Sequence, residues 1–137
     1  MKILDCTLRD GGYYNDWNFS SDLSKKYIQS ISKLPIDIIE VGYVSNNKND
    51  NFGLHYHLNV PYLKDIKKKL RKNQKLCCMV TAKEIKSSKD LIKLLLPYEG
   101  VVDLVRFAID PKKIDFFLNL IFKTKKKIKK ISFMINL

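Results

Sequence analysis

The sequence predicts an α/β fold in which strands and helices alternate along the whole chain. Two observations support this prediction. Short apolar runs recur at near-regular spacing, and segments with a helical apolar repeat lie between them. Such alternation is typical of βα units, whose strands pair in a parallel sheet. The pattern alone fits a doubly wound sheet and a fragment of a barrel about equally well.

Five strands and four intervening helices are expected. Apolar residues three and four positions apart mark the helices, and serines at 20 or 21 and at 87 or 88 are candidate caps. We expect a first strand that opens at residue 4 and four more over residues 36–43, 75–81, 101–108 and 131–137, with the helices between them. The apolar face of the first helix is predicted to be Leu23, Tyr27, Ile31 and Leu34, and that of the last Ile114, Phe117, Leu118, Ile121 and Phe122.

The first strand ends in residue types that suit a metal-enolate site. Residues 4–12 read Leu-Asp-Cys-Thr-Leu-Arg-Asp-Gly-Gly. Alternation along a strand would place Asp5, Thr7 and Arg9 on one face and Cys6, Leu8 and Asp10 on the other. Arg9 is a permanently charged fork that suits a carboxylate or enolate oxygen. Asp10 is a hard oxygen donor for a divalent cation. Gly11 and Gly12 allow a sharp turn and the close approach of a substrate.

A carboxylate interrupts the second strand, which is otherwise almost continuously apolar. Burying Glu40 without a partner would be costly. Arg9, at the end of the neighbouring strand, is its expected partner. Two interpretations remain open from the residue types: a positioned guanidinium with a chemical role, and a structural ion pair with none.

Composition and charge limit the kinds of partner that this chain is expected to have. The net charge is +12, from 26 Lys and Arg against 14 Asp and Glu. The basic segments 64–75 and 123–130 lie on or after helices with an apolar stripe opposite, which is typical of solvated faces, so nucleic acid is not expected as a partner. No apolar run reaches the roughly 20 residues of a membrane span. The three cysteines are expected to be free thiols in a reducing cytoplasm, and no signal peptide is expected at the N-terminus.

The long polar loop 44–59 is expected to be functional. It contains His55 and His57, two residues apart. Such a pair could ligate a metal, but we favour a surface or substrate-loop role. Arg106 and Asn136, on later strands, could add polar groups to a pocket wall. Asp5 and Asp103 could pair with basic residues in the sheet.

Residues 7–11 resemble the Thr-Leu-Arg-Asp-Gly signature of the metal-dependent aldolase and acyl-transferase superfamily. That superfamily contains hydroxymethylglutaryl-CoA lyase, isopropylmalate and homocitrate synthases, and 4-hydroxy-2-oxovalerate aldolase. Segment 4–14 is most similar to the aldolase-like branch. The resemblance implies a (β/α)8 TIM barrel. Such a barrel needs roughly 250 residues, so residues 1–137 are expected to form a single domain, an incomplete barrel that ends in its fifth strand.

The resemblance also implies the chemistry. Asp10 would ligate a divalent metal (Mn²⁺, Mg²⁺ or Zn²⁺), Arg9 would stabilise an enolate, and Glu40 would orient Arg9. Tyr13 stands where pyruvate aldolases place a catalytic histidine. Its phenol can donate or relay a proton, but because the unperturbed pKa of a phenol is about 10 it would be a poor base. The implied activity is a carbon–carbon lyase or condensing enzyme for pyruvate or another small 2-oxo acid. The alternative is a non-catalytic half-barrel that self-associates or binds a partner that completes the barrel.

Overall fold

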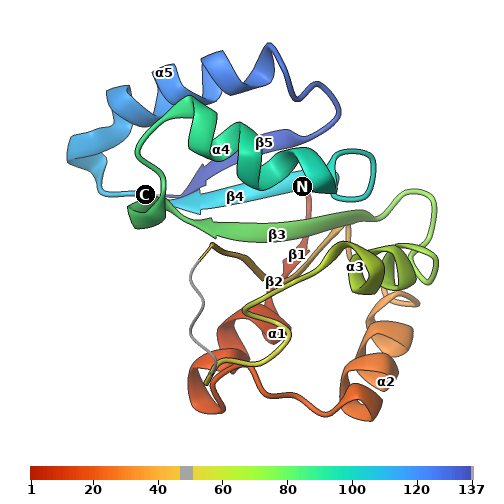
Figure 1. The fold of residues 1–137 in the computed structure, drawn as a ribbon. Helices are drawn as coiled ribbons and strands as arrows, with labels where there is room; N and C mark the ends of the chain where they lie inside the picture. The colour runs from red at the N-terminus through yellow and green to blue at the C-terminus, as the bar shows by residue number, and fades with distance from the viewer. Residues whose placement is uncertain (47–50, 137) are drawn as a thin grey trace.

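The computed structural model describes residues 1–46 and 51–136. A parallel five-stranded sheet in the order β1-β2-β3-β4-β5 curls into the N-terminal half of a (β/α)8 barrel (Figure 1). The strands are β1 (Leu4–Asp5), β2 (Ile38–Val44), β3 (Lys75–Thr81), β4 (Leu104–Ala108) and β5 (Ser132–Asn136). Strand order that follows chain order is the order of a barrel, whereas a doubly wound sheet reverses direction. The barrel prediction is therefore confirmed.

Four helices connect consecutive strands, as predicted. They are α2 (Ser21–Ile31), α3 (Val60–Lys67), α4 (Ser88–Leu95) and α5 (Ile114–Lys125), and a short helical turn, α1 (Thr7–Asp10), follows β1. The Ser20, Asn59 and Ser87 side chains accept hydrogen bonds from first-turn backbone N–H groups and so fix where α2, α3 and α4 begin.

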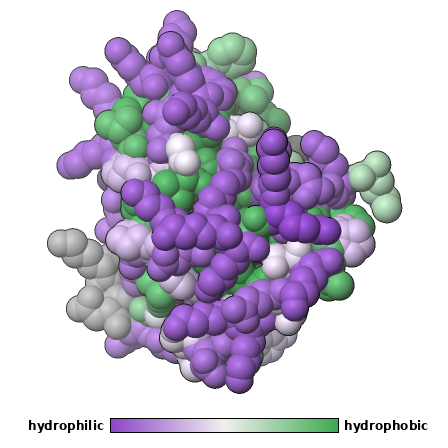
Figure 2. Space-filling model, turned by 90° about the vertical axis from the view of Figure 1, so that its right-hand side faces the viewer, coloured by the Kyte–Doolittle hydropathy of each residue, from purple (hydrophilic) through white to green (hydrophobic). Residues whose placement is uncertain are grey.

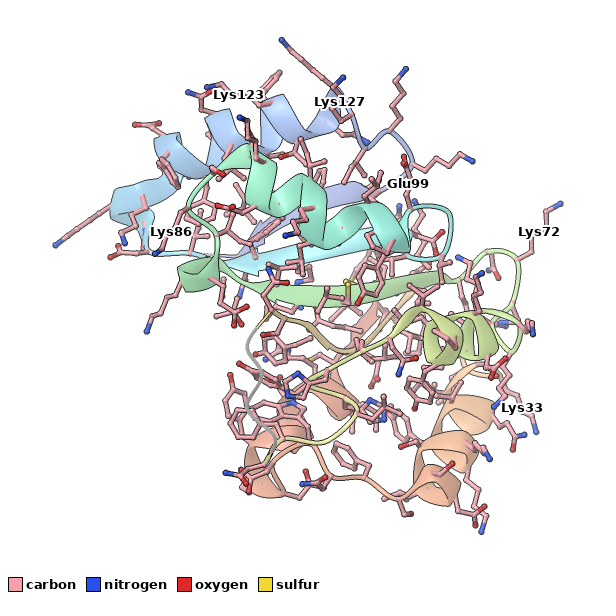
Figure 3. All side chains as sticks on the ribbon, in the orientation of Figure 1. Lys33, Lys72, Lys86, Glu99, Lys123 and Lys127 are labelled. Atoms are coloured by element: carbon pink, nitrogen blue, oxygen red, sulfur yellow. The ribbon has the colours of Figure 1, made fainter. Side chains whose placement is uncertain are left out.

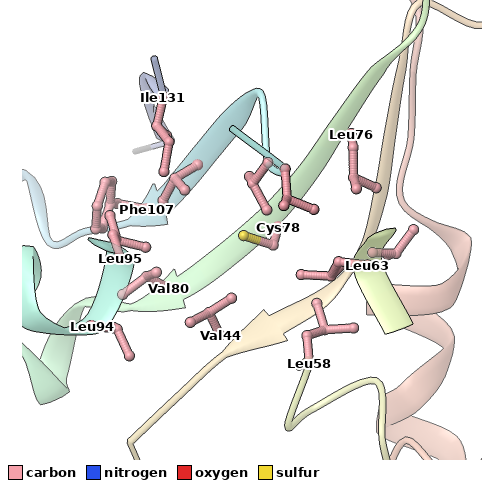
Figure 4. Packing of buried hydrophobic residues seen from close by; sticks show 14 of the residues in the cluster. Val44, Leu58, Leu63, Leu76, Cys78, Val80, Leu94, Leu95, Phe107 and Ile131 are labelled. Carbon is pink, nitrogen blue, oxygen red and sulfur yellow. The ribbon is translucent and has the colours of Figure 1, made fainter. Parts of the chain in front are cut away.

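The main core lies between the sheet and these helices (Figure 4). It contains alternate residues of the strands, among them Leu76, Cys78 and Val80 of β3. The residues between them face the inside of the curl, where Ile38, Cys77 and Leu104 form a separate buried cluster. The sheet is thus covered on one face by helices and lines a barrel interior with the other.

The predicted apolar faces of α2 and α5 were partly wrong. The buried residues are Ser24, Ile28 and Ile31 in α2 and Phe117, Leu120 and Thr124 in α5. Leu23 is 54% exposed and Phe122 is 73% exposed. Each true face includes a hydroxyl whose hydrogen bond is satisfied inside the protein, such as Thr124 Oγ1 to the Leu120 carbonyl oxygen (2.9 Å). A pattern that counts only apolar residues therefore places the face one residue away.

The first strand is much shorter than predicted. It ends at Asp5, and residues 7–10 form a helical turn, so the alternation of side chains expected over residues 5–10 was wrong. The Asp5 carboxylate accepts a hydrogen bond from Thr7 Oγ1 (2.9 Å), and the Cys6 carbonyl accepts bonds from the backbone N–H groups of Arg9 and Asp10. Such local bonds compete with strand pairing and turn the chain.

A bulge in β2 brings Tyr43 to the inner face of the sheet. The pairing of β2 with β3 shifts register between Glu40 and Tyr43. Without the shift, residues three apart on a strand would point to opposite faces. Gly42 sits in the bulge with φ +151°, and a Cβ there would lie 1.9 Å from the backbone oxygen of His55. The bulge thus needs a glycine and a loop that packs directly on it.

Replacing Gly42 with alanine should lower the free energy of unfolding by about 2–4 kcal/mol, from the left-handed backbone and the clash together. Urea unfolding followed by circular dichroism measures it. Gly100→Ala is the matched control, because Gly100 also has positive φ (+87°) but nothing lies within 4 Å of its added Cβ. The control should lose only about 1 kcal/mol. Equal losses in the two variants would contradict the role of the clash.

Candidate active site

A fully buried carboxylate organises the inner face of the sheet. Glu40 is 0% exposed. Its Oε1 accepts a hydrogen bond from Arg9 Nε (2.8 Å), and Arg106 Nη1 lies 3.0 Å from both of its oxygens. The Cys77 thiol lies 3.5 Å from Oε2. The predicted Arg9–Glu40 pair is therefore confirmed, and it is part of a larger ion cluster.

Arg106 was expected only as a possible polar group of a pocket wall, and the structure places it in this ion cluster. It is 9% exposed, on β4, and its Nε is buried with no hydrogen-bond partner among the described residues. A charged residue inside an apolar strand needs a buried counterion. The sequence therefore indicated that Arg106 has a buried anionic partner. It did not indicate that this partner is Glu40, because β3 lies between β2 and β4 and Arg106 has to reach across it.

Arg9 is held on two sides. Its Nη1 pairs with Asp10 Oδ1, and its Nε pairs with Glu40. Burial alone would lower the pKa of Arg9, but the hydrogen bond and charge of Glu40, with the charge of Asp10, raise it above the ordinary value. The guanidinium is thus fixed in place and permanently charged.

Asp10 lies beside Arg9 at the outer edge of the cluster. Its side chain is 54% exposed, and its Oδ2 accepts a hydrogen bond from the Cys6 thiol (3.1 Å). Burial, together with this bond, raises the pKa of Cys6 to about 11. Cys6 is therefore a protonated thiol at neutral pH. The carboxylate of Asp10, which accepts its hydrogen bond, stays partly open to solvent.

The described residues provide only part of a metal site. Within residues 1–46 and 51–136, no three His, Cys, Asp or Glu side chains come together in a way that could hold a metal ion. Asp10 could supply one oxygen ligand, whereas divalent cations in proteins take four or more ligands. A cation at Asp10 would need further donors.

Tyr13 and Tyr43 form a hydroxyl pair next to Arg9. Their phenol oxygens are 3.0 Å apart. Burial raises the pKa of Tyr43 above its ordinary value, the hydrogen bond with Tyr13 raises it further, and the nearby Arg9 opposes the shift. Tyr13 itself is 65% exposed. The phenol of Tyr43 is thus protonated at neutral pH.

Trp17 is placed with unusual backbone geometry. Asp16 and Trp17 both have positive φ, +53° and +57°. For residues other than glycine this costs of order 1–3 kcal/mol each, and such strain clusters at functional sites. The Trp17 indole Nε1 donates a hydrogen bond to the Arg9 carbonyl oxygen (2.8 Å). A Cβ on Gly12 would lie 2.0 Å from the Trp17 ring.

The close approach at Gly12 is therefore made by an indole. Gly11 has more room, since a Cβ there would lie 3.5 Å from the Phe19 ring. A substrate-binding role for the two glycines stays a prediction.

An aromatic cavity adjoins the ion cluster. Trp17 packs edge-on against Tyr13, Tyr43 and Phe52 with ring centroids 4.8–5.6 Å apart, and Tyr56 completes the group. A cavity of about 400 Å³ lies beside these rings and reaches the last residues of β3 and β4. The ends of barrel strands are where ligands of this fold bind.

His55 has a structural position. It is 1% exposed, so the predicted surface or substrate-loop role was wrong for this residue. Its Nδ1 lies 2.6 Å from the Val41 carbonyl oxygen, and its Nε2 lies 2.9 Å from Ser24 Oγ and 3.0 Å from the Tyr62 hydroxyl. These bonds join the loop before α3 to β2 and α2. A larger cavity of about 570 Å³ lies here, between α2 and α3.

The remaining polar residues singled out in the sequence lie outside the cluster. Asp103 pairs with Lys67 and accepts a bond from the Leu76 backbone N–H (2.7 Å), and Asp5 accepts one from the Tyr27 hydroxyl (2.9 Å). Asn136 lies at the exposed end of β5. Residues 47–50 of the predicted functional loop 44–59 are outside the described residues.

Charged groups cover the outside of the molecule. Lysines labelled in Figure 3, such as Lys72 and Lys127, project away from the ribbon, and Figure 2 shows hydrophilic residues over most of one face. Cys77 and Cys78 are buried and Cys6 is half-buried, and all three are free thiols, as expected. No helix of the described residues is long and apolar enough to cross a bilayer.

This chain is similar to the N-terminal domain of a putative aldolase from Bacteroides vulgatus. The crystal structure of that domain superposes with a TM-score of 0.86 at 39% sequence identity, over 98% of this chain. The match spans 44% of the other chain, so the likeness covers less than half of that protein. No family model matches the sequence, and no curated protein matches it.

Replacing Glu40 with glutamine should destabilise the fold by about 3–5 kcal/mol, because the buried Arg106 would lose its counterion and the half-buried Arg9 would keep only Asp10. Urea unfolding measures the loss. Asp22→Asn is the control, because it removes an exposed carboxylate that pairs with Lys26 on the surface of α2. The control should leave the urea midpoint unchanged. A Glu40→Gln variant as stable as the wild type would contradict the central role of this carboxylate.

Acidification below about pH 6.5 should destabilise the protein through His55. Burial lowers the pKa of His55 below its ordinary value. The unfolded chain therefore binds more protons than the folded one once the pH falls below the unfolded pKa of about 6.5, and the free energy of unfolding falls by up to about 1.4 kcal/mol per pH unit. Urea midpoints at pH 7 and pH 5 test this. His55→Gln should flatten the dependence, whereas His57→Gln should keep it. A His55→Gln variant with the wild-type slope would assign the effect elsewhere.

Proposed function

We propose that this chain contributes the enolate-stabilising part of an aldolase-type carbon–carbon lyase, or condensing enzyme, for pyruvate or another small 2-oxo acid. One observation carries the proposal. Arg9 is held by Glu40 beside the Asp10 carboxylate, at the end of the first strand of a barrel. The similarity to the domain named as a putative aldolase supports the same interpretation of the site.

The charges of the cluster favour an anionic substrate. Arg9 and Arg106 carry two positive charges, and Glu40 and Asp10 carry two negative ones. Glu40 lies between the two arginines, whereas Asp10 contacts Arg9 from the half-exposed outer edge. The three inner groups, Arg9, Arg106 and Glu40, thus sum to one positive charge. A carboxylate, or the oxygen of an enolate, would be attracted to it.

Arg9 would act where charge develops. In the cleavage direction a 4-hydroxy-2-oxo acid loses the proton of its 4-hydroxyl group, the C3–C4 bond breaks, and an aldehyde leaves. The electron pair stays on C3 as the enolate of the 2-oxo acid, and a proton then adds to C3. A preorganised guanidinium lowers the energy of that enolate because it needs no reorientation. The Tyr13–Tyr43 hydroxyl pair could carry the proton.

A divalent metal remains part of the proposal as an expectation from the resemblance. Mn²⁺, Mg²⁺ or Zn²⁺ would act as a Lewis acid for the 2-oxo acid. Asp10 is the described residue suited to bind it, and since the described residues do not complete a site, no step above depends on the ion.

Arg9→Gln should reduce the exchange of pyruvate methyl protons for deuterium at least 100-fold, because the enolate loses its charged donor. Proton NMR of pyruvate in D2O, with and without added Mn²⁺, measures the exchange directly and needs no aldehyde. Arg71→Gln is the control, because Arg71 is an exposed arginine that bonds the Leu34 carbonyl oxygen away from the cluster. It should exchange at the wild-type rate.

Exchange by Arg9→Gln at the wild-type rate would remove Arg9 from the chemistry. A wild-type protein that exchanges no pyruvate protons under either condition would contradict the enzymatic proposal as a whole.

A second candidate is a non-catalytic half-barrel that associates with itself or with a partner that completes the barrel. The observation that favours it is on the β5 side. Residues of β5 alternate between exposed and half-buried, and Phe116, Leu118 and Phe122 of α5 are 50%, 43% and 73% exposed. An apolar strand edge is a template for pairing with another chain. Association seen by sedimentation, together with no pyruvate exchange, would support this candidate.

A further inference from the structure

We propose that the aromatic cavity beside Arg9 binds an aryl or similarly flat apolar group. The inference rests on the proposed function in one respect: that group would belong to the second reactant, the aldehyde that leaves on cleavage. The binding itself can be tested without any reaction.

The rings line a space that they do not fill. Tyr13, Trp17, Tyr43, Phe52 and Tyr56 contact one another in edge-on or tilted pairs with centroids 4.5–5.6 Å apart. About 400 Å³ remains beside them. A flat ring can be held there against the faces and edges of these side chains, which is the favoured geometry of aromatic pairs.

The cavity is attached to the ion cluster by covalent and hydrogen-bonded connections. Trp17 donates to the Arg9 carbonyl oxygen, and Tyr43 follows Glu40 on β2 after the bulge at Gly42. The residues of the ion cluster do not line the cavity themselves, and Trp17 and Tyr43 connect the two. A molecule with an anionic end at Arg9 and an apolar end in the cavity would span this connection.

The local backbone conformation positions Trp17 beside the aromatic cavity. Two consecutive residues other than glycine, Asp16 and Trp17, adopt positive φ. Added Cβ atoms at Gly12 and Gly53 would lie 2.0 Å from the Trp17 ring and 2.2 Å from its backbone oxygen. Trp17 is 5% exposed and packs in a buried cluster with Tyr43 and Met79, and it also lines the cavity. The two glycines and the strained backbone thus fix the indole as one wall of the cavity.

Among the described residues, few polar groups line the cavity. Besides the phenols they are Thr81 and Lys83, and the other described residues of the lining are apolar, including Met79, Ala82 and Ala108. A lining with few polar groups favours an uncharged, apolar ligand. An acceptor as small as acetaldehyde would leave most of the space unfilled, whereas a phenyl ring would use it.

Trp17 makes the test direct, because it is the single tryptophan of the chain. Its fluorescence, excited at the red edge of its absorption, is followed while benzyl alcohol is added; ethanol is the small comparison. Benzyl alcohol mimics an aryl aldehyde without reacting with lysines. We expect a saturable change with benzyl alcohol and at least tenfold weaker binding of ethanol.

Ala108→Phe is the blocking variant. Ala108 lines the cavity from an exposed position at the end of β4, so a phenyl group there would occupy the space without disturbing the core. The variant should lose the saturable change at least tenfold. Leu118→Phe, which adds a ring on the exposed side of α5, is the control and should bind as the wild type does.

The outcomes separate this inference from the proposed function. If benzyl alcohol gave no saturable change in fluorescence, or if the wild type and Ala108→Phe bound it equally, the inference would be overturned even with normal pyruvate exchange. Saturable binding in a protein without exchange would support the cavity and reject the aldolase proposal. Where exchange is present, benzaldehyde should exceed acetaldehyde at least tenfold in kcat/KM as the acceptor, and the reverse order would also overturn the inference.

Discussion

The inner face of this half-barrel depends on one buried carboxylate. Glu40 carries a charge in a place with no solvent, and it is tolerated there because guanidiniums from two other parts of the chain reach it. Arg9 comes from the turn after β1 and Arg106 from β4, so the ion cluster joins segments that are far apart in sequence. The same bonds that satisfy Glu40 fix the position of Arg9.

Much of this architecture is predictable because it follows from local patterns. Strand 75–81 was predicted with the bounds that the structure gives, since a continuous apolar run between turns has few alternatives. The pairing of Arg9 with Glu40 was predictable from the cost of a lone buried charge. Arg106 was not placed there, because reaching Glu40 across β3 is a property of the curled sheet, which no single strand encodes.

The errors have a common physical origin. Hydrogen bonds by short polar side chains decided the local structure at Asp5, Ser24 and Thr124. At Asp5 they ended a strand early, and at Ser24 and Thr124 they allowed a hydroxyl to be buried where an apolar residue was expected. Patterns of hydrophobicity carry no information on these bonds. His55 was misplaced for a similar reason, because its three bonds in the interior could not be seen from its neighbours.

Departures from regular structure coincide with the site. The chain turns early after β1, β2 has a bulge at Gly42, and the backbone at Asp16 and Trp17 adopts positive φ. The early turn places Arg9 and Asp10 side by side, the bulge brings Tyr43 to the inner face, and the third departure sets an indole against the Arg9 carbonyl group. A sheet needs none of these features for its own stability. Their shared location, next to one buried ion cluster and one aromatic cavity, is the reason to regard both as parts of a single binding site.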